Sequence, residues 1–342
     1  MRAMLTARPL QAMGRRRLLA DAATLCVAAL AGLPRNAAAE PAPETRRIRF
    51  LHAPALCLAP QYLAEDLLRL EGFTDIEYAD MGTQHGPNVV AAGGADISMW
   101  DTPGTIPALE SGKVIVLGGV HAGCIEVFGN DRIKGLRDIK GKRVAIVDYG
   151  NSDHVFISSL AAYIGIDPHT DINWVRVGIR GDAVQAFSEG KADALMAFPP
   201  QPQELRARRI GHVVLDTVQD RPWSQYFCCS VHANREFVAK HPIATKRVLR
   251  AILKSADLCA RDPQTAAAYM VAKGYETRPA IALEVVSGLP YRRWRDSDPA
   301  DTVRFYALRL HEVGMIKTPP HKLVAQGTDL RFFRELTREL KA

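Results

Sequence analysis

The sequence predicts an α/β fold made of two similar halves, followed by a mostly helical C-terminal part. Between Arg47 and Val231, strand-like apolar segments alternate with segments of helical periodicity, a pattern typical of a largely parallel sheet. Residues 93–99 read Gly-Gly-Ala-Asp-Ile-Ser-Met, and residues 190–196 read Gly-Lys-Ala-Asp-Ala-Leu-Met. The second copy starts 97 residues after the first, too far apart for a solenoid repeat, so we interpret the pair as two halves of the same topology.

The first half is expected to open with a strand over residues 47–51, where charged and apolar residues alternate. A helix is expected over residues 60–70, because Pro60 suits a first helical turn and the apolar residues that follow recur on one face. The remaining elements expected in this half are strands at 75–78, 94–100 and 114–120, a helix at 105–111 and an extended segment at 124–128.

The same pattern begins again at Gly141. Here we expect strands at 141–147, 172–177, 190–196 and 212–215, with helices at 152–164 and 182–188. A further strand is expected at 226–231. The C-terminal part then shows helical spacing at 237–260, 265–272, 279–287, 302–313 and 329–340, and Pro242 offers an alternative start for the first of these helices.

The N-terminus has the three parts of a secretory signal. Arg15-Arg16-Arg17 precedes an Ala-rich apolar stretch that ends near Leu33, and three alanines occupy positions 37–39. We therefore predict a signal peptide over residues 1–39, and the adjacent arginines favour the twin-arginine route. A membrane anchor is disfavoured because the apolar stretch is shorter than the ~20 residues that span a bilayer.

The basic charge of the chain belongs mainly to this signal. The chain has 44 Lys+Arg and 37 Asp+Glu, a net charge of +7. Residues 1–39 hold six arginines and one aspartate, so the remainder has 38 basic and 36 acidic residues and a net charge of +2. No basic stripe suited to a phosphate backbone remains, so nucleic acid is not an expected partner.

Five cysteines follow the signal, at positions 57, 124, 228, 229 and 259. Their odd number and irregular spacing define no disulfide framework, and whether any two pair is left open. Adjacent Cys228 and Cys229 do not have the spacing of a structural zinc site. Most of the five are expected to be small buried apolar side chains.

Several segments together resemble a known family. They are 47–50, the Ala64-Glu65-Asp66 helix, Gly94-Ala95-Asp96, Leu136 to Val144, Gly190 to Ala194 and Phe237 to Pro242. In this order they are similar to solute-binding proteins of the sulfonate/nitrate/taurine and thiamine-pyrimidine-precursor (NMT) type. The resemblance covers nearly all of residues 46–290.

The resemblance implies a type II periplasmic-binding-protein fold. Two lobes would be joined by two extended crossovers, with a helical C-terminal tail packed on lobe I. Lobe I would comprise residues 46–128 and 226–342, and lobe II residues 129–225. The protein would be a periplasmic monomer that binds a small-molecule ligand and delivers it to the permease and ATPase subunits of an ABC importer. It would be neither membrane-embedded nor an enzyme.

The candidate binding site follows from the ends of the strands. In open α/β sheets, ligands bind beyond the carboxyl ends of the strands, which places five segments at the cleft: 52–58, 82–86, 100–104, 149–154 and 198–201. Two crossover segments, 121–124 and 223–227, should line its back wall. The predicted ligand-binding residues are Cys57, Thr83, Gln84, His85, Asp101, Thr102, His121, Tyr149, Asn151, Ser152, Phe198, Trp223 and Tyr226.

These residues suit a small organic solute, either anionic or ring-containing. Asn151 and Ser152 open a predicted helix, whose free N–H groups suit an anionic or carbonyl group. Aromatic side chains from separate strand ends offer flat surfaces to a ring. Asp101 and Thr102 are equally suited to capping the helix that follows them.

Three other functions stay open on the sequence alone. One is an NMT-like enzyme of pyrimidine or thiamine metabolism, although no nucleophile elbow, phosphate-binding loop or His-Glu-x-x-His motif is present. A second is metal capture, for which histidines 52, 85, 121 and 154 and cysteines 57 and 124 are of suitable type but match no known spacing. The third is a sensor component without a transport role. We expect no cofactor, and the spacing assigns no metal ligand.

Overall fold

The computed structural model describes residues 40–53, 55–178 and 181–341. The predicted signal peptide therefore lies outside the described residues. Residues 42–341 belong to one compact unit. None of the helices described in it combines the length and the apolar character needed to cross a bilayer.

The strands are short and mostly buried. Their bounds are β1 (Arg47–Leu51), β2 (Asp75–Ala79), β3 (Ile97–Asp101), β4 (Val114–Ala122), β5 (Glu126–Gly129), β6 (Arg143–Ile146), β7 (Asn173–Arg176), β8 (Ala194–Ala197), β9 (His212–Asp216) and β10 (Phe227–Asn234).

Helices separate most of these strands and make up the C-terminal part. The α-helices are α2 (Ala59–Leu63), α3 (Glu65–Leu70), α4 (Gly86–Ala91), α5 (Thr102–Leu109), α6 (Ser152–Tyr163), α7 (Ala183–Ser188), α8 (Gln201–Ala207), α9 (Arg235–Lys240), α10 (Pro242–Arg261), α11 (Pro263–Ala272), α12 (Pro279–Gly288), α13 (Pro299–Glu312), α14 (Pro320–Gly327) and α15 (Arg331–Glu339). Short 3₁₀ helices are η1 (Leu56–Leu58), η2 (Leu136–Ile139), η3 (Trp223–Gln225) and η4 (Tyr291–Arg295).

The strands form two groups, which we call the first half and the second half. The first half holds β1–β4 and β10 (residues 46–122 and 227–341 with their helices), and the second half holds β5–β9 (residues 126–216). In the first half β1 pairs with β2 in parallel, and β10 lies antiparallel between β3 and β4. The Asp96 N–H donates to the Arg49 carbonyl at 2.8 Å, which places β1 beside the start of β3. The order is thus β2-β1-β3-β10-β4.

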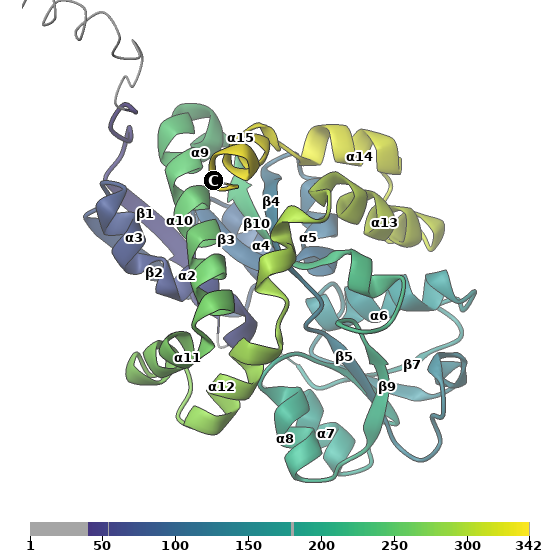
Figure 1. Cartoon of the computed structure of the whole chain (residues 1–342). Helices are drawn as coiled ribbons and strands as arrows, with labels where there is room; N and C mark the ends of the chain where they lie inside the picture. Colours follow the sequence, from purple (N-terminus) through teal and green to yellow (C-terminus); the bar gives the residue numbers. More distant parts are fainter. Residues whose placement is uncertain (1–39, 54, 179–180, 342) are drawn as a thin grey trace, which may run out of the picture. The chain divides into compact units, whose positions relative to one another are not determined.

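The second half repeats this order. Its five strands run β7-β6-β8-β5-β9. Strand β6 pairs in parallel with β7 and β8, and β5 lies antiparallel between β8 and β9. The predicted two-fold topology is therefore present as two separate groups of strands, and the two Gly-x-Ala-Asp segments belong to different groups (Figure 1).

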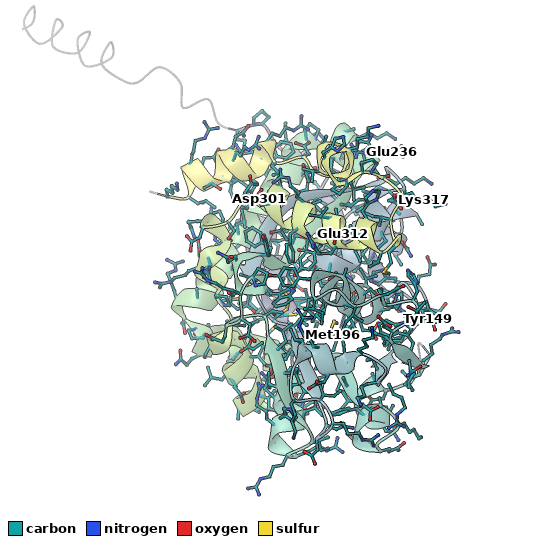
Figure 2. The ribbon with its side chains drawn as sticks, turned by 90° about the vertical axis from the view of Figure 1, so that its right-hand side faces the viewer. Tyr149, Met196, Glu236, Asp301, Glu312 and Lys317 are labelled. Carbon is teal, nitrogen blue, oxygen red and sulfur yellow. A yellow bond between two sulfur atoms is a disulfide. The ribbon has the colours of Figure 1, made fainter. Side chains whose placement is uncertain are left out.

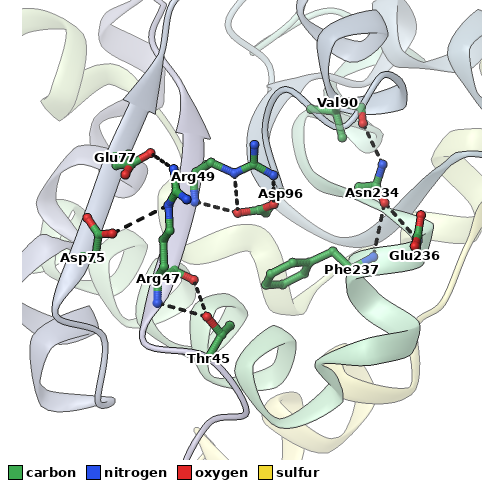
Figure 3. A network of polar contacts seen from close by, with 10 residues as sticks. All are labelled: Thr45, Arg47, Arg49, Asp75, Glu77, Val90, Asp96, Asn234, Glu236 and Phe237. Carbon is green, nitrogen blue, oxygen red and sulfur yellow. Dashed lines mark hydrogen bonds and ion pairs between the residues drawn. The ribbon is translucent and has the colours of Figure 1, made fainter.

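The repeated aspartate has the same task in both halves. In the first half, Asp96 accepts hydrogen bonds from the backbone N–H and the guanidinium of Arg49, and Asp96 Oδ1 lies 2.6 Å from Arg49 Nη2 (Figure 3). In the second half, Asp193 accepts the same set of bonds from Arg143, with Oδ1 to Nη2 at 3.1 Å. Each carboxylate directly precedes one strand, β3 or β8, and ties its start to the neighbouring strand, β1 or β6.

The C-terminal helices pack on the first half, as the fold prediction required. Helices α10, α13, α14 and α15 contact β4, and α10 also contacts α2 and α3 (Figure 1). The 3₁₀ helix η4 adds Tyr291 and Trp294, both without solvent exposure, against β4 and α10. Helix α13 also reaches α6 of the second half.

The chain crosses between the halves twice. The first crossover runs from the end of β4 to the start of β5, and the second from the end of β9 to the start of β10. Thr217 Oγ1 in the second crossover accepts hydrogen bonds from the N–H groups of Cys124 and Ile125 in the first, at 3.1 and 3.0 Å. A disulfide between Cys124 and Cys228 also joins the first crossover to the start of β10.

Candidate functional site

A cavity of about 220 Å³ lies between the two halves. The first half contributes residues 53, 55, 57, 58, 81, 85, 100, 101 and 229, and the second half and the first crossover contribute residues 124, 125, 147, 151, 152, 153, 183, 196, 198 and 201. The cavity is smaller than the ~300–1,000 Å³ common for drug-sized ligands. Its size therefore suits a small metabolite.

The lining comes mainly from loops that follow parallel strands. Ala53, Ala55 and Cys57 follow β1, Trp100 and Asp101 end β3, and Phe198 follows β8. Because parallel strands end at one edge of a sheet, their following loops gather at that edge. Each of the five segments that the sequence placed at a cleft contributes at least one residue to the cavity.

A polar network connects the halves across the cavity. Asp101 is the N-cap of α5, and its Oδ2 accepts from the Gly104 N–H at 2.7 Å. Its other oxygen, Oδ1, accepts a hydrogen bond from the hydroxyl of Ser152, the first residue of α6. A single carboxylate therefore caps a helix of the first half and holds the N-terminus of a helix of the second half.

Trp100 and His85 complete this network. The Trp100 indole N–H faces Ser152 Oγ at 3.1 Å and His85 Nε2 at 3.2 Å. Because an indole nitrogen only donates, His85 Nε2 is an acceptor and the proton of the neutral ring lies on Nδ1. Burial lowers the pKa of His85 to about 4, so the ring is uncharged at neutral pH.

The cavity has an acidic and otherwise apolar character. Burial raises the pKa of Asp101 and of Asp153 to about 6. Asp153 accepts backbone hydrogen bonds from the N–H groups of Val147 and His154. None of the described lining residues is Lys or Arg, and apolar side chains such as Met81 and Met196 form much of the wall.

Cysteine sulfur forms part of the wall. Cys57, Cys124 and Cys229 all line the cavity. Cys124 is in the disulfide with Cys228, a pairing 104 residues apart that the sequence left open. Cys57, Cys229 and Cys259 are buried free thiols, in line with the expectation of buried cysteines.

Six of the thirteen predicted ligand-binding residues line the cavity: Cys57, His85, Asp101, Asn151, Ser152 and Phe198. Three others lie in loops away from it. Thr83 and Gln84 are exposed, and Tyr149 is 54% exposed at the margin of the molecule, whereas Met196 lies further inward (Figure 2). Tyr149 instead lies under the guanidinium of Arg176.

The other four predicted residues are packed into the protein. The Thr102 hydroxyl donates to Ser230 Oγ at 3.0 Å, and His121 is completely buried. Trp223 packs edge-on against Tyr163, and Tyr226 stacks on Phe305 with ring centroids 4.1 Å apart. The aromatic residues of the second crossover therefore hold α6 and α13 in place and do not form the back wall of this cavity.

Sequence reasoning missed the apolar side of the site. Met81, Val147, Ala183 and Met196 line the cavity but are ordinary core types in the sequence. For Met196 a signal existed, since it ends the repeated Gly-x-Ala-Asp segment. Its counterpart Met99 is fully buried and does not line the cavity, so the repeat alone could not separate the two.

Residues 75–266 match the protein family described as NMT1/THI5 like, which is more than half of the 342-residue chain. No curated protein matches the chain.

Solved structures share its fold at low identity. The periplasmic nitrate-binding protein NrtA from Synechocystis PCC 6803 is 15% identical, covers 88% of this chain and 90% of its own, and has a TM-score of 0.73. The alkanesulfonate-binding protein SsuA from Xanthomonas axonopodis pv. citri, bound to MOPS, is 19% identical. The match covers 86% of this chain and 100% of SsuA, with a TM-score of 0.64. The desulfurization enzyme DszB is 14% identical. The match covers 86% of this chain and 99% of DszB, with a TM-score of 0.58. The fold is therefore that of the periplasmic binding proteins, as the sequence predicted.

Proposed function

The chain belongs to the NMT1/THI5-like family, and from this premise we propose that it is the solute-binding component of an ABC importer. The observation that carries the proposal is a cavity lined by both halves, with a hydrogen bond from Ser152 across it to Asp101. A solute held on both sides would lower the free energy of the closed form and shift an open–closed equilibrium about the two crossovers. The permease and ATPase subunits would then recognise the closed form.

We propose boundaries for the two lobes that follow the strand pairing. Strand β5 pairs with β8 and β9, so the first crossover would precede Glu126, slightly earlier than the boundary predicted at residue 129. The predicted return to lobe I at residue 226 falls next to the start of β10 at Phe227.

The ligand we propose is a small, mainly apolar solute that is neutral or cationic and carries a hydrogen-bond donor. Asp101 and Asp153 are the charged groups among the described lining residues, and a second anion beside them would be repelled. Trp100 and Phe198 offer flat apolar surfaces to a ring. Of the two ligand types expected from the sequence, the ring-containing one fits this wall better than the anionic one.

A periplasmic location also belongs to the proposal. It rests on the signal-like pattern of residues 1–39 and on the fold shared with the periplasmic nitrate-binding protein NrtA. Export by the twin-arginine route and a monomeric state complete it. Fractionation of expressing cells measures the compartment.

An enzymatic role has one feature in its favour, the contact of 3.1 Å between His85 Nε2 and Ser152 Oγ. A serine nucleophile needs a base whose lone pair takes the hydroxyl proton. Here the Trp100 indole N–H faces the same lone pair, and the Ser152 hydroxyl donates to Asp101 instead. This arrangement favours solute binding over acyl transfer. The likeness to DszB concerns the fold.

Native mass spectrometry of the freshly purified protein is the first test. We expect one organic molecule of low mass to be retained, or one member of a library of neutral and cationic metabolites to bind by calorimetry. In the variant M196W, which places a large side chain in the cavity, affinity should fall by more than about tenfold, or 1.4 kcal/mol.

The control is L308W, which adds the same side chain at a position on α13 that is 39% exposed. It should bind like the wild type. Absence of any bound or binding metabolite, or equal affinity in M196W and L308W, would contradict the assignment of this cavity.

A further inference from the structure

A cluster of potential metal ligands lies at the cavity wall. It comprises Cys57, His121, Cys124 and Cys229, all buried, and one ligand atom of each lies within 4.8 Å of the others. Cys57 comes from η1, His121 from β4, Cys229 from β10 and Cys124 from the first crossover. Sequence spacing could not reveal the group, because its members come from four separate segments.

The fold brings these side chains together by strand register and by one backbone anchor. Cys229 and His121 are register partners on the antiparallel strands β10 and β4, so their side chains can share a face of the sheet. Thr217 Oγ1 accepts the Cys124 N–H and fixes that residue at the turn between the halves. The cluster therefore occupies a rigid part of the molecule.

His121 has the hydrogen-bonding state of a metal ligand. The side chain has no solvent exposure, and Nδ1 lies 3.1 Å from the Gly123 carbonyl. A proton on Nδ1 leaves the lone pair on Nε2, which has no hydrogen-bond partner among the described residues. A metal-binding histidine usually binds the ion through one ring nitrogen and donates the N–H of the other ring nitrogen to a carbonyl or carboxylate.

The two free thiols of the cluster are in contact. The Cys229 thiol donates a hydrogen bond to the Cys57 sulfur, and this contact together with burial raises the pKa of Cys229 well above its usual value. A bound cation favours the thiolates, because thiolate and not thiol is the ligand form.

We propose that Cys57, Cys124, Cys229 and His121 bind one thiophilic cation of the Zn²⁺ or Cu⁺ type once the Cys124–Cys228 disulfide is reduced. Thiolate and imidazole ligands select these ions over Mg²⁺ or Ca²⁺. In the disulfide form Cys124 cannot supply a thiolate, and only two cysteines and the histidine remain. Cys124 thus serves either the disulfide or the metal.

Reduction of the Cys124–Cys228 disulfide requires a thiol reductant, which balances the reaction. Two reductant thiols become one disulfide as the bond between Cys124 and Cys228 is cleaved to two thiols. Binding of Zn²⁺ then releases three protons, one from each coordinating cysteine, and none from neutral His121.

The geometry requires a modest contraction. Zn–S bonds of about 2.3 Å in a tetrahedral site place sulfur atoms roughly 3.8 Å apart. The largest separation in the cluster is 4.8 Å, so movements of about 1 Å complete the site, within reach of side-chain rotation. The site does not rest on the proposed transport function, because a solute can occupy the cavity whether or not this wall holds a cation.

The test uses Co²⁺ and Zn²⁺ with the full chain carrying C26S, so that its remaining cysteines are the five described here. Two variants form a matched pair, because both abolish the disulfide. C228S keeps all four proposed ligands, whereas C124S removes one. We expect C228S to bind one equivalent of Co²⁺ without reductant, with the thiolate-to-cobalt charge-transfer absorption of a three-sulfur site, and Zn²⁺ to displace it.

The parent protein should bind in the same way only after anaerobic reduction. C124S should bind Co²⁺ at least about a hundredfold more weakly than C228S. Loss of a residue that only hydrogen-bonds to a metal ligand already weakens metal affinity about 10–100-fold, and C124S loses a ligand itself. C259S, which removes a buried cysteine outside the cluster, is the control and should match the reduced parent. Circular dichroism and thermal unfolding establish that each variant is folded.

Equal affinity of folded C228S and C124S would overturn the proposal, as would failure of reduced parent protein to bind Co²⁺. H121N, which removes the imidazole ligand, should also weaken Co²⁺ binding; if it unfolds, the C228S and C124S pair still decides the question. Failure of the metal site does not imply failure of the transport proposal. If the protein binds no Zn²⁺ but still binds a metabolite, only the metal proposal is refuted.

Discussion

Asp96 and Asp193 show how a single residue can define the start of a strand pair. Each accepts hydrogen bonds from the backbone and the guanidinium of one arginine on the neighbouring strand. The repeated segment made both aspartates visible in the sequence. Their partners Arg49 and Arg143 lie in segments that resemble each other little, so the anchor itself could not be predicted.

Replacing this anchor should destabilise the protein. In D193N, a carboxylate with a side chain only 3% exposed is lost while Arg143 stays in place, and we expect a loss of about 3 kcal/mol in the free energy of unfolding. The control D75N removes an ion pair whose side chains are both 55% exposed and should change stability by less than about 1 kcal/mol. Urea unfolding measures both. Similar values for the two variants would refute the anchor role.

Residues at the ends of strands were predictable members of the cavity, and so was the first crossover, which contributes Cys124, but the aromatic residues of the second crossover do not line it. Asp101 and Ser152 follow directly from where β3 ends and α6 begins. Trp223 and Tyr226 have the same residue types as pocket aromatics, but their direction depends on Tyr163 and Phe305, which the sequence does not place nearby. The type of a residue and its position along a strand can be predicted from a sequence. The direction in which a loop side chain points cannot.

At the scale of elements, long periodic segments were predicted well and short helices were missed. The C-terminal helix α10 begins at Pro242, the alternative start that the sequence offered. Helices α4 (Gly86–Ala91), α8 (Gln201–Ala207) and α14 (Pro320–Gly327) were not predicted. Each has Pro in its first turn and eight residues or fewer, so packing and not intrinsic periodicity stabilises it.

Helix α5 begins at Thr102, earlier than the predicted residue 105, because Asp101 caps it and Pro103 suits its first turn. This early start brings Gly104 against α6. A Cβ at Gly104 would lie 2.5 Å from Ser152 Oγ and 2.6 Å from Asp101 Oδ2. The first turn of α5 can therefore meet α6 only with glycine at this position.

The variant G104A should separate α5 from α6. We expect faster hydrogen exchange at the N-terminus of α6 than in the wild type, because the Ser152–Asp101 hydrogen bond is displaced. The control is G288A, where an added Cβ meets no atom within 4 Å. It should leave exchange in α6 unchanged. An unchanged α6 in G104A would show that the contact is not required.

For the whole molecule, the order of elements was sufficient to predict two halves of one topology. The orders β2-β1-β3-β10-β4 and β7-β6-β8-β5-β9 correspond strand by strand. What the sequence could not provide is the fit of one half against the other. The cavity wall and the sulfur cluster arise there, from segments far apart in the chain.

Stability should fall as the pH decreases from about 6.5 to 4. Burial lowers the pKa of His85 and His154 to about 4 and of His232 to about 3, so in this window the unfolded chain binds protons that the folded chain does not. Asp101 and Asp153 have pKa values raised to about 6, so their protonation stabilises the folded chain as the pH falls. These two aspartates offset only part of the effect of the three histidines. We expect a net loss of a few kcal/mol.

Urea unfolding at a series of pH values measures this loss. The variant H232L removes a fully buried histidine whose two ring nitrogens have no hydrogen-bond partner among the described residues. Its curve should be flatter between pH 6.5 and 4 than that of the wild type. A wild-type curve that is level or rises toward acid in this window would contradict the prediction.

The second half begins and ends on adjacent strands. Glu126, at the start of β5, is the register partner of Asp216, at the end of β9. The second half is therefore one uninterrupted stretch of sequence, residues 126–216, whose first and last residues lie side by side. Recombination at that point would exchange one wall of the proposed binding cavity for another while leaving the remaining chain continuous.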